Sequence, residues 1–242
     1  MRYRQNFVQK EPRVDQIEYL YKHSYDGYGT RSLEIRGPVD FDLGQLYNDD
    51  FVAVDKNIKG FLREKNSGLV ILHGIQGSGK TSYIRHLISN SEKSFVYLPM
   101  EMASCLSDPQ LMTYIRQNMQ DSVIVIEDCE QLLQDRGSNP SQMNSGLSNI
   151  LNISDGLLGD SLCLKFICTF NNDLKSIDKA LLRKGRLVEK YQFGKLSKEK
   201  TAKLISKVHG IDGDFGEMTL SEIFNLKHEN HGNSVEKKRI GF

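Results

Sequence analysis

Residues 74–82 have the types and spacing of a loop that binds phosphate groups. The segment reads GIQGSGKTS and matches the pattern G-x-x-x-x-G-K-[ST]. Its glycines let successive backbone N–H groups turn toward an anion, and a helix that starts after the loop adds the positive end of its dipole. Lys80 has the reach to contact the β- and γ-phosphates of a nucleotide, and the Thr81 hydroxyl is a ligand for Mg²⁺. The predicted phosphate-binding residues are Gly74, Ile75, Gln76, Gly77, Ser78, Gly79, Lys80, Thr81 and Ser82.

Two carboxylates, Glu127 and Asp128, directly follow the apolar run 123–126. In a P-loop ATPase, a neighbouring strand supplies one carboxylate to the hydration shell of Mg²⁺ and a second that activates the attacking water. Most such strands end in Asp–Glu, so the order Glu–Asp raises the question whether this chain hydrolyses a nucleotide or only binds one. By position, Glu127 is predicted to take the metal role and Asp128 the water role. A second register, with Asp128 at the metal and Glu130 at the water, remains open.

These groups need a scaffold to hold them, and the apolar pattern from residue 50 onward predicts alternating strands and helices. The expected strands are 68–73, 95–98, 123–126 and 164–170, and the expected helices are 52–63, one around 84–88, one from 108 and one from 147. Strands that are almost continuously apolar are typical of a parallel sheet covered on both faces. The sequence therefore predicts an α/β fold with three layers.

Both ends of the chain depart from this alternation. Residues 197–208 read as a helix closed by Gly210, and residues 219–222 form a capping box that opens another, so a small helical lid is expected. Near the N-terminus, the apolar residues Val14, Ile17, Leu20 and Tyr21 have the spacing of one helical face. The expected units are an N-terminal segment with a short helix and a connector (1–45), an α/β core (46–195), and a helical lid and tail (196–242).

Composition sets limits on the class of protein. The chain has 242 residues, is 38% hydrophobic and 26% charged, and carries a formal net charge of +1. These values are ordinary for a globular protein and give no chain-wide basic field for nucleic acid. No apolar run approaches the roughly 18–20 residues of a membrane helix, and the N-terminus lacks the apolar region of a secretory signal. A cytoplasmic protein without contact with a membrane is therefore expected. Its four cysteines form no metal-binding pattern, so reduced thiols are expected as well.

Two further segments carry a resemblance to a known family. Residues 145–160 read SGLSNILNISDGLLGD, and residues 166–191 read FICTFNNDLKSIDKALLRKGRLVEKY. With the phosphate loop and the two acids, they resemble the AAA family of ATPases, and within it the branch of the mitochondrial translocase of the Rieske iron–sulfur protein. The resemblance implies ATP and Mg²⁺ as ligands. It places Asn171, or alternatively Asn172, where the family holds the attacking water, and Arg183 and Arg186 match arginine fingers that reach into a neighbouring subunit.

The resemblance implies an ATP hydrolase that works as a ring of identical subunits, a hexamer by expectation, and remodels a protein or protein complex. The chain looks like a stand-alone module of bacterial type, since residues 1–45 resemble no substrate-recruiting domain. The segment 98–111, LPMEMASCLSDPQL, lacks the aromatic residue and the glycine of a protein-threading pore loop, so its apolar side chains are expected to pack in the core. Three alternatives remain: a nucleic-acid-associated ATPase such as a loader or a transposition or defence regulator, a nucleotide-gated assembly module with little turnover, and a small-molecule kinase.

Overall fold

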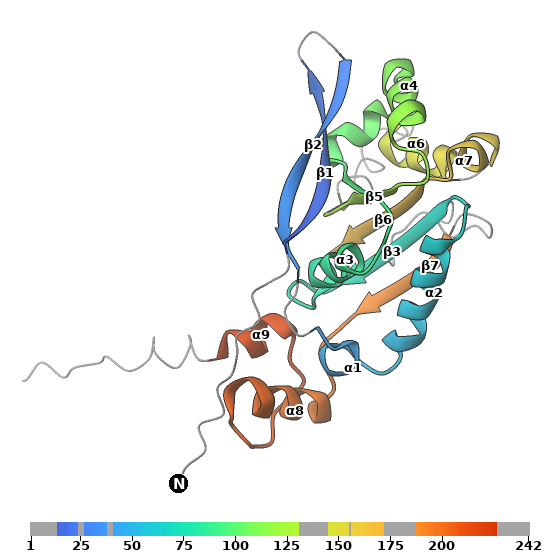
Figure 1. Ribbon diagram of the computed structural model, residues 1–242. Helices are drawn as coiled ribbons and strands as arrows, with labels where there is room; N and C mark the ends of the chain where they lie inside the picture. The colour runs from blue at the N-terminus through green and yellow to red at the C-terminus, as the bar shows by residue number, and fades with distance from the viewer. Residues whose placement is uncertain are drawn as a thin grey trace, which may run out of the picture.

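The computed structural model describes residues 14–23, 27–37, 41–130, 145–154, 156–171 and 187–226. In these residues, one seven-stranded sheet runs in the order β2-β1-β4-β5-β6-β3-β7 (Figure 1). The strands are β1 (Val14–His23), β2 (Gly27–Arg36), β3 (Gly68–Gly74), β4 (Phe95–Tyr97), β5 (Val123–Ile126), β6 (Lys165–Phe170) and β7 (Leu187–Phe193). Neighbouring strands pair in parallel, except that β1 and β2 are antiparallel. The carboxyl ends of β3, β5 and β6 therefore meet at one edge of the sheet.

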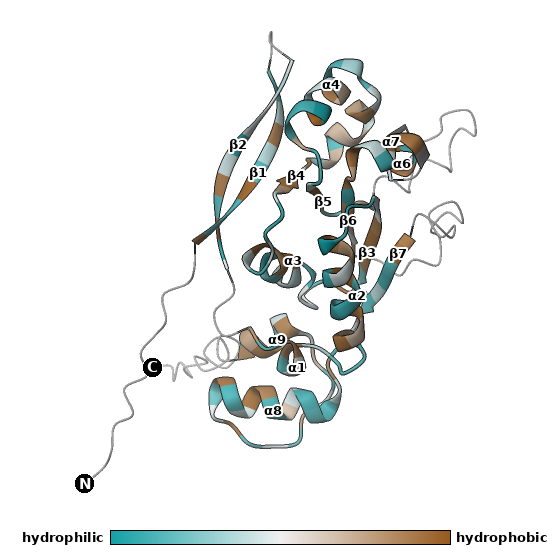
Figure 2. Cartoon of the chain, turned by 45° about the vertical axis from the view of Figure 1, so that its right-hand side comes forward, coloured by the Kyte–Doolittle hydropathy of each residue, from teal (hydrophilic) through white to brown (hydrophobic). Residues whose placement is uncertain are grey.

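Helices cover both faces of the sheet. One face carries α2 (Phe51–Arg63) and α3 (Lys80–Ser89); the other carries the 3₁₀ helix η1 (Met100–Ser107), α4 (Pro109–Asn118), α6 (Ser145–Ile153) and α7 (Gly156–Leu162) (Figure 1). Side chains of β3 alternate between the two apolar cores: Val70 and Leu72 pack on the α2–α3 side, and Leu69 and Ile71 on the other. All four are fully buried, and the central strands are correspondingly hydrophobic in Figure 2. The predicted three-layer α/β fold is confirmed.

The lid forms from α8 (Lys198–His209) and α9 (Leu220–Phe224), which lie beside the short helix α1 (Leu43–Leu46) (Figure 1). Its predicted boundaries follow from local chemistry. Gly210 ends α8 in the left-handed region, with φ of 66°, and Thr219 opens α9 with a reciprocal capping box to Glu222. The end of α8 and the start of α9 therefore lie at the capping residues that the sequence predicts.

The helix predicted at residues 14–21 is wrong, because this segment is β1. Ile17 and Leu20 are both buried, but they belong to different cores, as expected when successive strand residues alternate between two covered faces. β1 pairs with β4 through Glu18 and Tyr19, so the hairpin β1–β2 extends the sheet of the core. The division of the chain at residues 45 and 195 stays a prediction.

A further strand, β7, was not among the predicted elements. It pairs in parallel with β3 at the edge of the sheet. Its buried residues are Tyr191 and Phe193 near its end, with the exposed Gln192 between them. Charged residues in its first half gave it no continuous apolar run. Within the described part of the chain, no helix is both long and apolar enough to cross a membrane.

Candidate active site

The phosphate loop connects β3 to α3, as predicted, and its glycines have backbone conformations that other residues rarely adopt. Gly74, Gly77 and Gly79 have φ of 124°, 76° and 99°. At Gly74 a Cβ atom would lie 1.9 Å from the carbonyl oxygen of Phe193, so the end of β7 leaves no room for a side chain there. The loop is thus held tightly between β7 and the first turn of α3, whose unpaired N–H groups face the end of the loop.

Lys80 is the first residue of α3, and its ammonium group is folded over the loop. It donates to the carbonyl oxygens of Gly74 at 2.9 Å and Ile75 at 3.0 Å. Burial lowers the pKa of Lys80, while nearby carboxylates, Asp128 foremost, act in the opposite direction without outweighing it. A nucleotide phosphate would add a negative partner to this desolvated cation, which favours its charged form.

Thr81 and Glu127 meet although they are far apart in the sequence. The Thr81 hydroxyl donates to Glu127 Oε1 at 2.6 Å. A hydroxyl beside a carboxylate at the mouth of a phosphate loop is the oxygen donor set that Mg²⁺ uses together with nucleotide phosphates and water. Among the described residues, no group of three or more His, Cys, Asp or Glu is arranged to hold a metal ion, so a cation here would take its remaining ligands from phosphate and water. The residues present fit a magnesium ion bound with a nucleotide.

Asp128 is held in a left-handed conformation, with φ of 55°. Its backbone N–H donates to the Thr169 hydroxyl at 3.0 Å, and its Oδ1 accepts a hydrogen bond from Asn171 Nδ2 at 2.6 Å. Glu130 accepts a hydrogen bond from the backbone N–H of Asn171. The side chain of Asp128 is therefore paired with the polar residue at the end of β6, whereas Glu127 is paired with Thr81. Because both Asp128 and Glu130 contact Asn171, the choice between the two registers stays a prediction.

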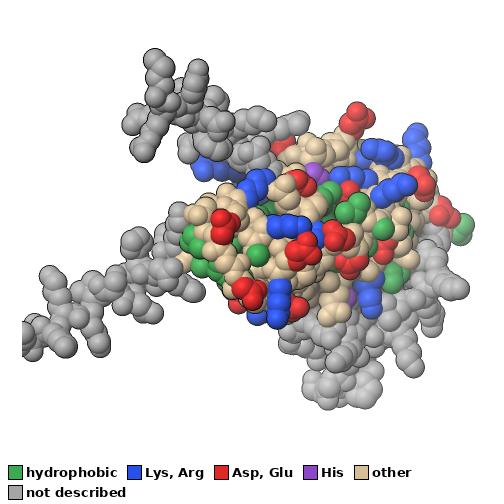
Figure 3. Space-filling view, turned by 90° about the horizontal axis from the view of Figure 1, so that it is seen from below, with side chains coloured by type: hydrophobic (Ala, Val, Ile, Leu, Met, Phe, Trp, Pro, Cys, Tyr) green, Lys and Arg blue, Asp and Glu red, His purple; other side chains and the backbone are tan. Residues whose placement is uncertain are grey.

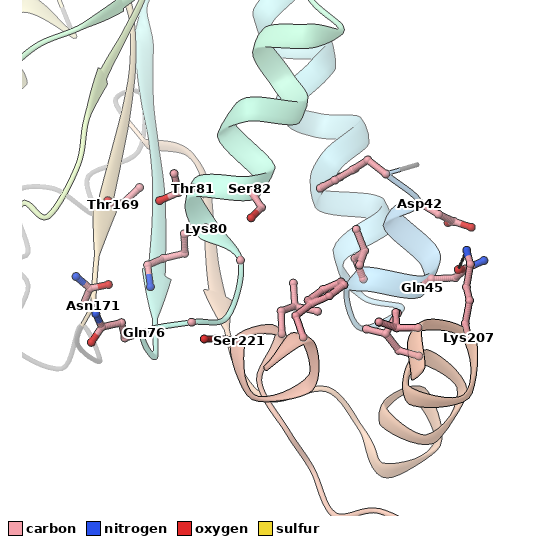
Figure 4. A pocket seen from close by; sticks show the side chains of 18 of the residues that line it. Asp42, Gln45, Gln76, Lys80, Thr81, Ser82, Thr169, Asn171, Lys207 and Ser221 are labelled. Carbon is pink, nitrogen blue, oxygen red and sulfur yellow. Dashed lines mark hydrogen bonds between the residues drawn. The ribbon is translucent and has the colours of Figure 1, made fainter. Parts of the chain in front are cut away.

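Thr81, Asp128, Thr169 and Asn171 line a cavity of about 630 Å³, which has its phosphate end here. Lys80, Asn171 and Gln76 lie together at that end in Figure 4, and Gln45 and Lys207 lie at the opposite end. The lining residues are Phe41, Asp42, Gln45, Leu46, Gln76, Gly77, Gly79, Lys80, Thr81, Ser82, Asp128, Thr169, Asn171, Leu204, Lys207, Val208, Leu220, Ser221 and Phe224. Apolar side chains from α1, α8 and α9 also line the cavity. A cavity with phosphate-binding groups at one end and an apolar slot beyond them suits a nucleotide.

The lid touches the phosphate loop directly. The backbone N–H of Ser221, in the first turn of α9, donates to the carbonyl oxygen of Gly77 at 3.0 Å. A Cβ atom at Gly77 would lie 2.7 Å from Ser221 Cβ, so the close approach depends on the glycine. On the other side of the cavity, Lys207 of α8 donates to Gln45 Oε1 of α1 at 2.5 Å. The lid and the segment before α2 thus close the cavity together.

The structure places most of the predicted site residues around this cavity. Ser82 lines it, Ser78 is buried and donates to the carbonyl oxygen of Ile75, and the Ile75 side chain is exposed. The predicted finger residues Arg183 and Arg186, and the alternative Asn172, lie outside the described residues. In η1, Leu106 is buried, and Met100 and Met102 pack against the same core, which confirms the expected packing of this segment.

Sequence reasoning missed the far end of the cavity and missed Thr169. The residues of α1 and the lid have no motif of their own, and their approach depends on how the chain returns across the end of the sheet. Thr169 had a weak signal: it lies two residues before Asn171 at the end of a strand, so both side chains are expected on the same face.

The fold and the loop together define the class. A parallel sheet with a glycine-rich loop between a central strand and a helix, and with acids at the end of a nearby strand, is a P-loop nucleotide-binding protein. Residues 70–195 match the family described as ATPase family associated with various cellular activities (AAA). This match covers just over half of the chain, so the chain belongs to the AAA family of ATPases.

Relatives of known name agree with this assignment. AAA-ATPase At5g17760 of Arabidopsis thaliana is 27% identical over 192 residues, which cover 72% of this chain and 38% of that protein. Probable mitochondrial chaperone BCS1-B of Dictyostelium discoideum is 25% identical over 187 residues (65% and 40%). ATPase family AAA domain-containing protein 2 of Homo sapiens is 32% identical over 154 residues (59% and 11%). The resemblance to the branch of the mitochondrial chaperones is confirmed, and the chain spans less than half the length of these relatives.

Proposed function

We propose that this AAA ATPase binds ATP with Mg²⁺ in the cavity between the core and the lid, hydrolyses it at the contacts between subunits of a ring, and uses the cycle to remodel a protein or protein complex. The observation that carries the proposal is the meeting of Thr81 with Glu127 and of Asp128 with Asn171 at the phosphate end of one cavity.

The residues divide the chemical work. The backbone of 74–81 and the Lys80 ammonium would hold the phosphates, and Thr81 and Glu127 would hold magnesium, which neutralises phosphate charge. Asp128, oriented by Asn171, would accept a proton from water as its oxygen attacks the γ-phosphorus. The bond from that phosphorus to the bridging oxygen then breaks, and ADP and inorganic phosphate are released.

The charge around the reacting phosphate supports the proposal of a ring of subunits. The transferring phosphoryl group needs cations around it, and among the described residues lining this end of the cavity the cation is Lys80. The resemblance gives Arg183 and Arg186 the place of residues that complete a neighbouring subunit's site. A guanidinium supplied in this way is worth about 10³–10⁵ in rate, which makes turnover depend on assembly.

Support for a protein substrate comes from the names of relatives, among them mitochondrial chaperones. Nucleic acid is not favoured by charge, because the face of the molecule seen in Figure 3 mixes Lys and Arg with Asp and Glu over its described part. A nucleic-acid-associated ATPase would also require stimulation by DNA or RNA that falls steeply with salt.

The test compares the wild-type protein with Lys80→Ala and Arg183→Ala. We expect ATP to shift the wild type to a larger assembly with measurable turnover, Lys80→Ala to lose ATP binding, and Arg183→Ala to bind ATP with turnover lowered by orders of magnitude. A wild-type protein that stays monomeric with ATP, together with full turnover by Arg183→Ala, would refute the ring. ATP-driven assembly of the wild type without turnover would instead identify a nucleotide-gated assembly module.

A further inference from the structure

Tyr47 lies directly after α1 and is almost completely buried between the lid, α2 and the phosphate loop. Its exposed fraction is 3%. Its ring packs against Phe51 at a centroid distance of 4.7 Å and against Phe193 at 5.5 Å. These contacts fix the ring, so the direction of its hydroxyl group is set by the aromatic cluster around it.

The hydroxyl of Tyr47, which is not among the residues that line the cavity, reaches the phosphate loop at Gly79. It donates to the carbonyl oxygen of Gly79 at 2.9 Å. The same oxygen accepts the backbone N–H of Tyr83, the first hydrogen bond of α3, also at 2.9 Å. In a trans peptide the carbonyl and the following N–H point in opposite directions. Two donors that hold the Gly79 carbonyl therefore aim the backbone N–H of Lys80 toward the phosphate end of the cavity.

Gly79 needs such support because its conformation is unusual. Its φ is 99°, and a Cβ atom on it would lie 3.0 Å from the Tyr47 hydroxyl oxygen and 2.6 Å from Leu220 Cδ1 of the lid. Glycine loses more backbone freedom than any other residue when it is fixed. The hydrogen bond from Tyr47 is one of the two that hold the Gly79 carbonyl oxygen in its orientation.

The backbone of Tyr47 is held by the lid. Lys200 of α8 donates to the carbonyl oxygens of Tyr47 at 2.7 Å and Gly44 at 2.6 Å, and it forms an ion pair with Asp49 at 2.7 Å. The Lys200 side chain is only 12% exposed. The lid is thus joined to α1 by a largely buried lysine, and Tyr47, directly after α1, is joined to the phosphate loop by its hydroxyl.

We propose that Tyr47 is a positioning residue for nucleotide phosphates: its hydroxyl fixes the Gly79–Lys80 peptide, and its backbone, through Lys200, ties that peptide to the lid. The inference deepens the proposed function and rests on the binding of a nucleotide at this loop. It predicts that loss of one hydroxyl group weakens phosphate binding without a matching loss of fold stability.

The first test is Tyr47→Phe, with Tyr191→Phe as the matched control. Tyr191 belongs to the same aromatic cluster, but its hydroxyl donates to Asp50 at 3.1 Å and does not touch the loop. We expect the Kd of Tyr47→Phe for ATP and ADP to rise about fivefold, the loss of one hydrogen bond, and KM to rise with it while kcat changes less than twofold. The control should keep wild-type Kd and KM, and the two variants should have similar melting temperatures.

The second test addresses the link to the lid. Lys200→Met removes the ammonium group from that link, and Lys203→Met is its control, because Lys203 is largely exposed on α8 and pairs with Glu199. We expect Lys200→Met alone to weaken nucleotide binding several-fold. The double variant Tyr47→Phe/Lys200→Met should lose less affinity than the product of the two single effects, because both act through the same peptide.

The outcomes separate the two levels of inference. Wild-type Kd in Tyr47→Phe, or an equal loss in Tyr191→Phe, would overturn the positioning role and leave the proposed function intact. Strictly multiplicative effects in the double variant would overturn the tie to the lid. If the wild-type protein bound neither ATP nor ADP, the proposed function would fall together with this inference.

Discussion

Thr169 offers a sharp test of how Asp128 is positioned for turnover. Its side chain is only 2% exposed, and its hydroxyl accepts the backbone N–H of Asp128 at 3.0 Å. Asp128 has a φ of 55°, a conformation that costs a non-glycine residue about 1–2 kcal/mol. The hydrogen bond from its N–H to Thr169 is one of the interactions that offset this cost.

Thr169→Val keeps the shape of the side chain and removes the acceptor. The N–H of Asp128 then loses a hydrogen bond in a partly buried position, which costs about 1–1.5 kcal/mol. The free energy of this lost hydrogen bond is comparable with the cost of the left-handed conformation. In most molecules Asp128 would therefore adopt a different backbone conformation. A loss of about 1.4 kcal/mol corresponds to about a tenfold change. We therefore expect kcat to fall about tenfold, with ATP affinity within twofold of wild type.

The assay is steady-state ATP hydrolysis with a separate measurement of ATP binding, and Thr201→Val serves as the control. Thr201 is fully buried in α8, and its hydroxyl donates to the carbonyl oxygen of Leu196 at 3.3 Å. Both variants should lower Tm by about 2–4 °C for each kcal/mol lost. If Thr169→Val lowered Tm but kept wild-type kcat, or if Thr201→Val lost kcat equally, the argument from the conformation of Asp128 would be wrong.

Three further predictions address the acids, the loop and the fold. Glu127→Gln should raise the Mg²⁺ concentration needed for ATP binding, whereas Asp128→Asn should bind ATP normally and lose turnover; the reverse result in a magnesium titration would support the second register. Gly77→Ala, at φ of 76°, should weaken ATP binding about tenfold, because the left-handed conformation costs about 1–2 kcal/mol and the methyl group pushes the lid away; an unchanged Kd would contradict this. Asp121 accepts a hydrogen bond from the fully buried Lys165 at 2.8 Å, and although burial opposes its ionisation, its lysine partners lower its pKa below the ordinary 3.8. The contribution of Asp121 to the free energy of unfolding should therefore be present above about pH 4 and lost as the pH falls through its lower pKa in the folded protein. Asp121→Asn should lower the free energy of unfolding by about 3 kcal/mol at pH 7, and denaturant unfolding of this variant should lack that pH dependence.

The misread segment 14–21 shows the limit of a local pattern. Ile17 and Leu20 are three residues apart, which is the spacing of a helical face, and both are buried. In β1 they are buried for another reason: the sheet is covered on both sides, so a strand can hide residues of either parity. Pairing with β2 along the whole strand, and with β4 far along the chain, distinguishes the two cases.

The sequence by itself determined the phosphate loop, the alternation of strands and helices, and the caps of the lid. These features depend on contacts within a few residues: glycine conformation, the N–H groups at the start of a helix, and side chains that cap their own turn. The sequence also placed two acids after β5, but it left their roles open between two registers.

The tertiary structure decided which groups meet. The strand order β5-β6-β3 brings Glu127 to Thr81 and Asp128 to Thr169 and Asn171. The same packing brings α1 and the lid to the far side of the loop, where Tyr47 contacts Gly79. No local pattern encodes these contacts, because each joins residues on different strands or helices, and their distances are set by how the whole sheet and its covering helices pack.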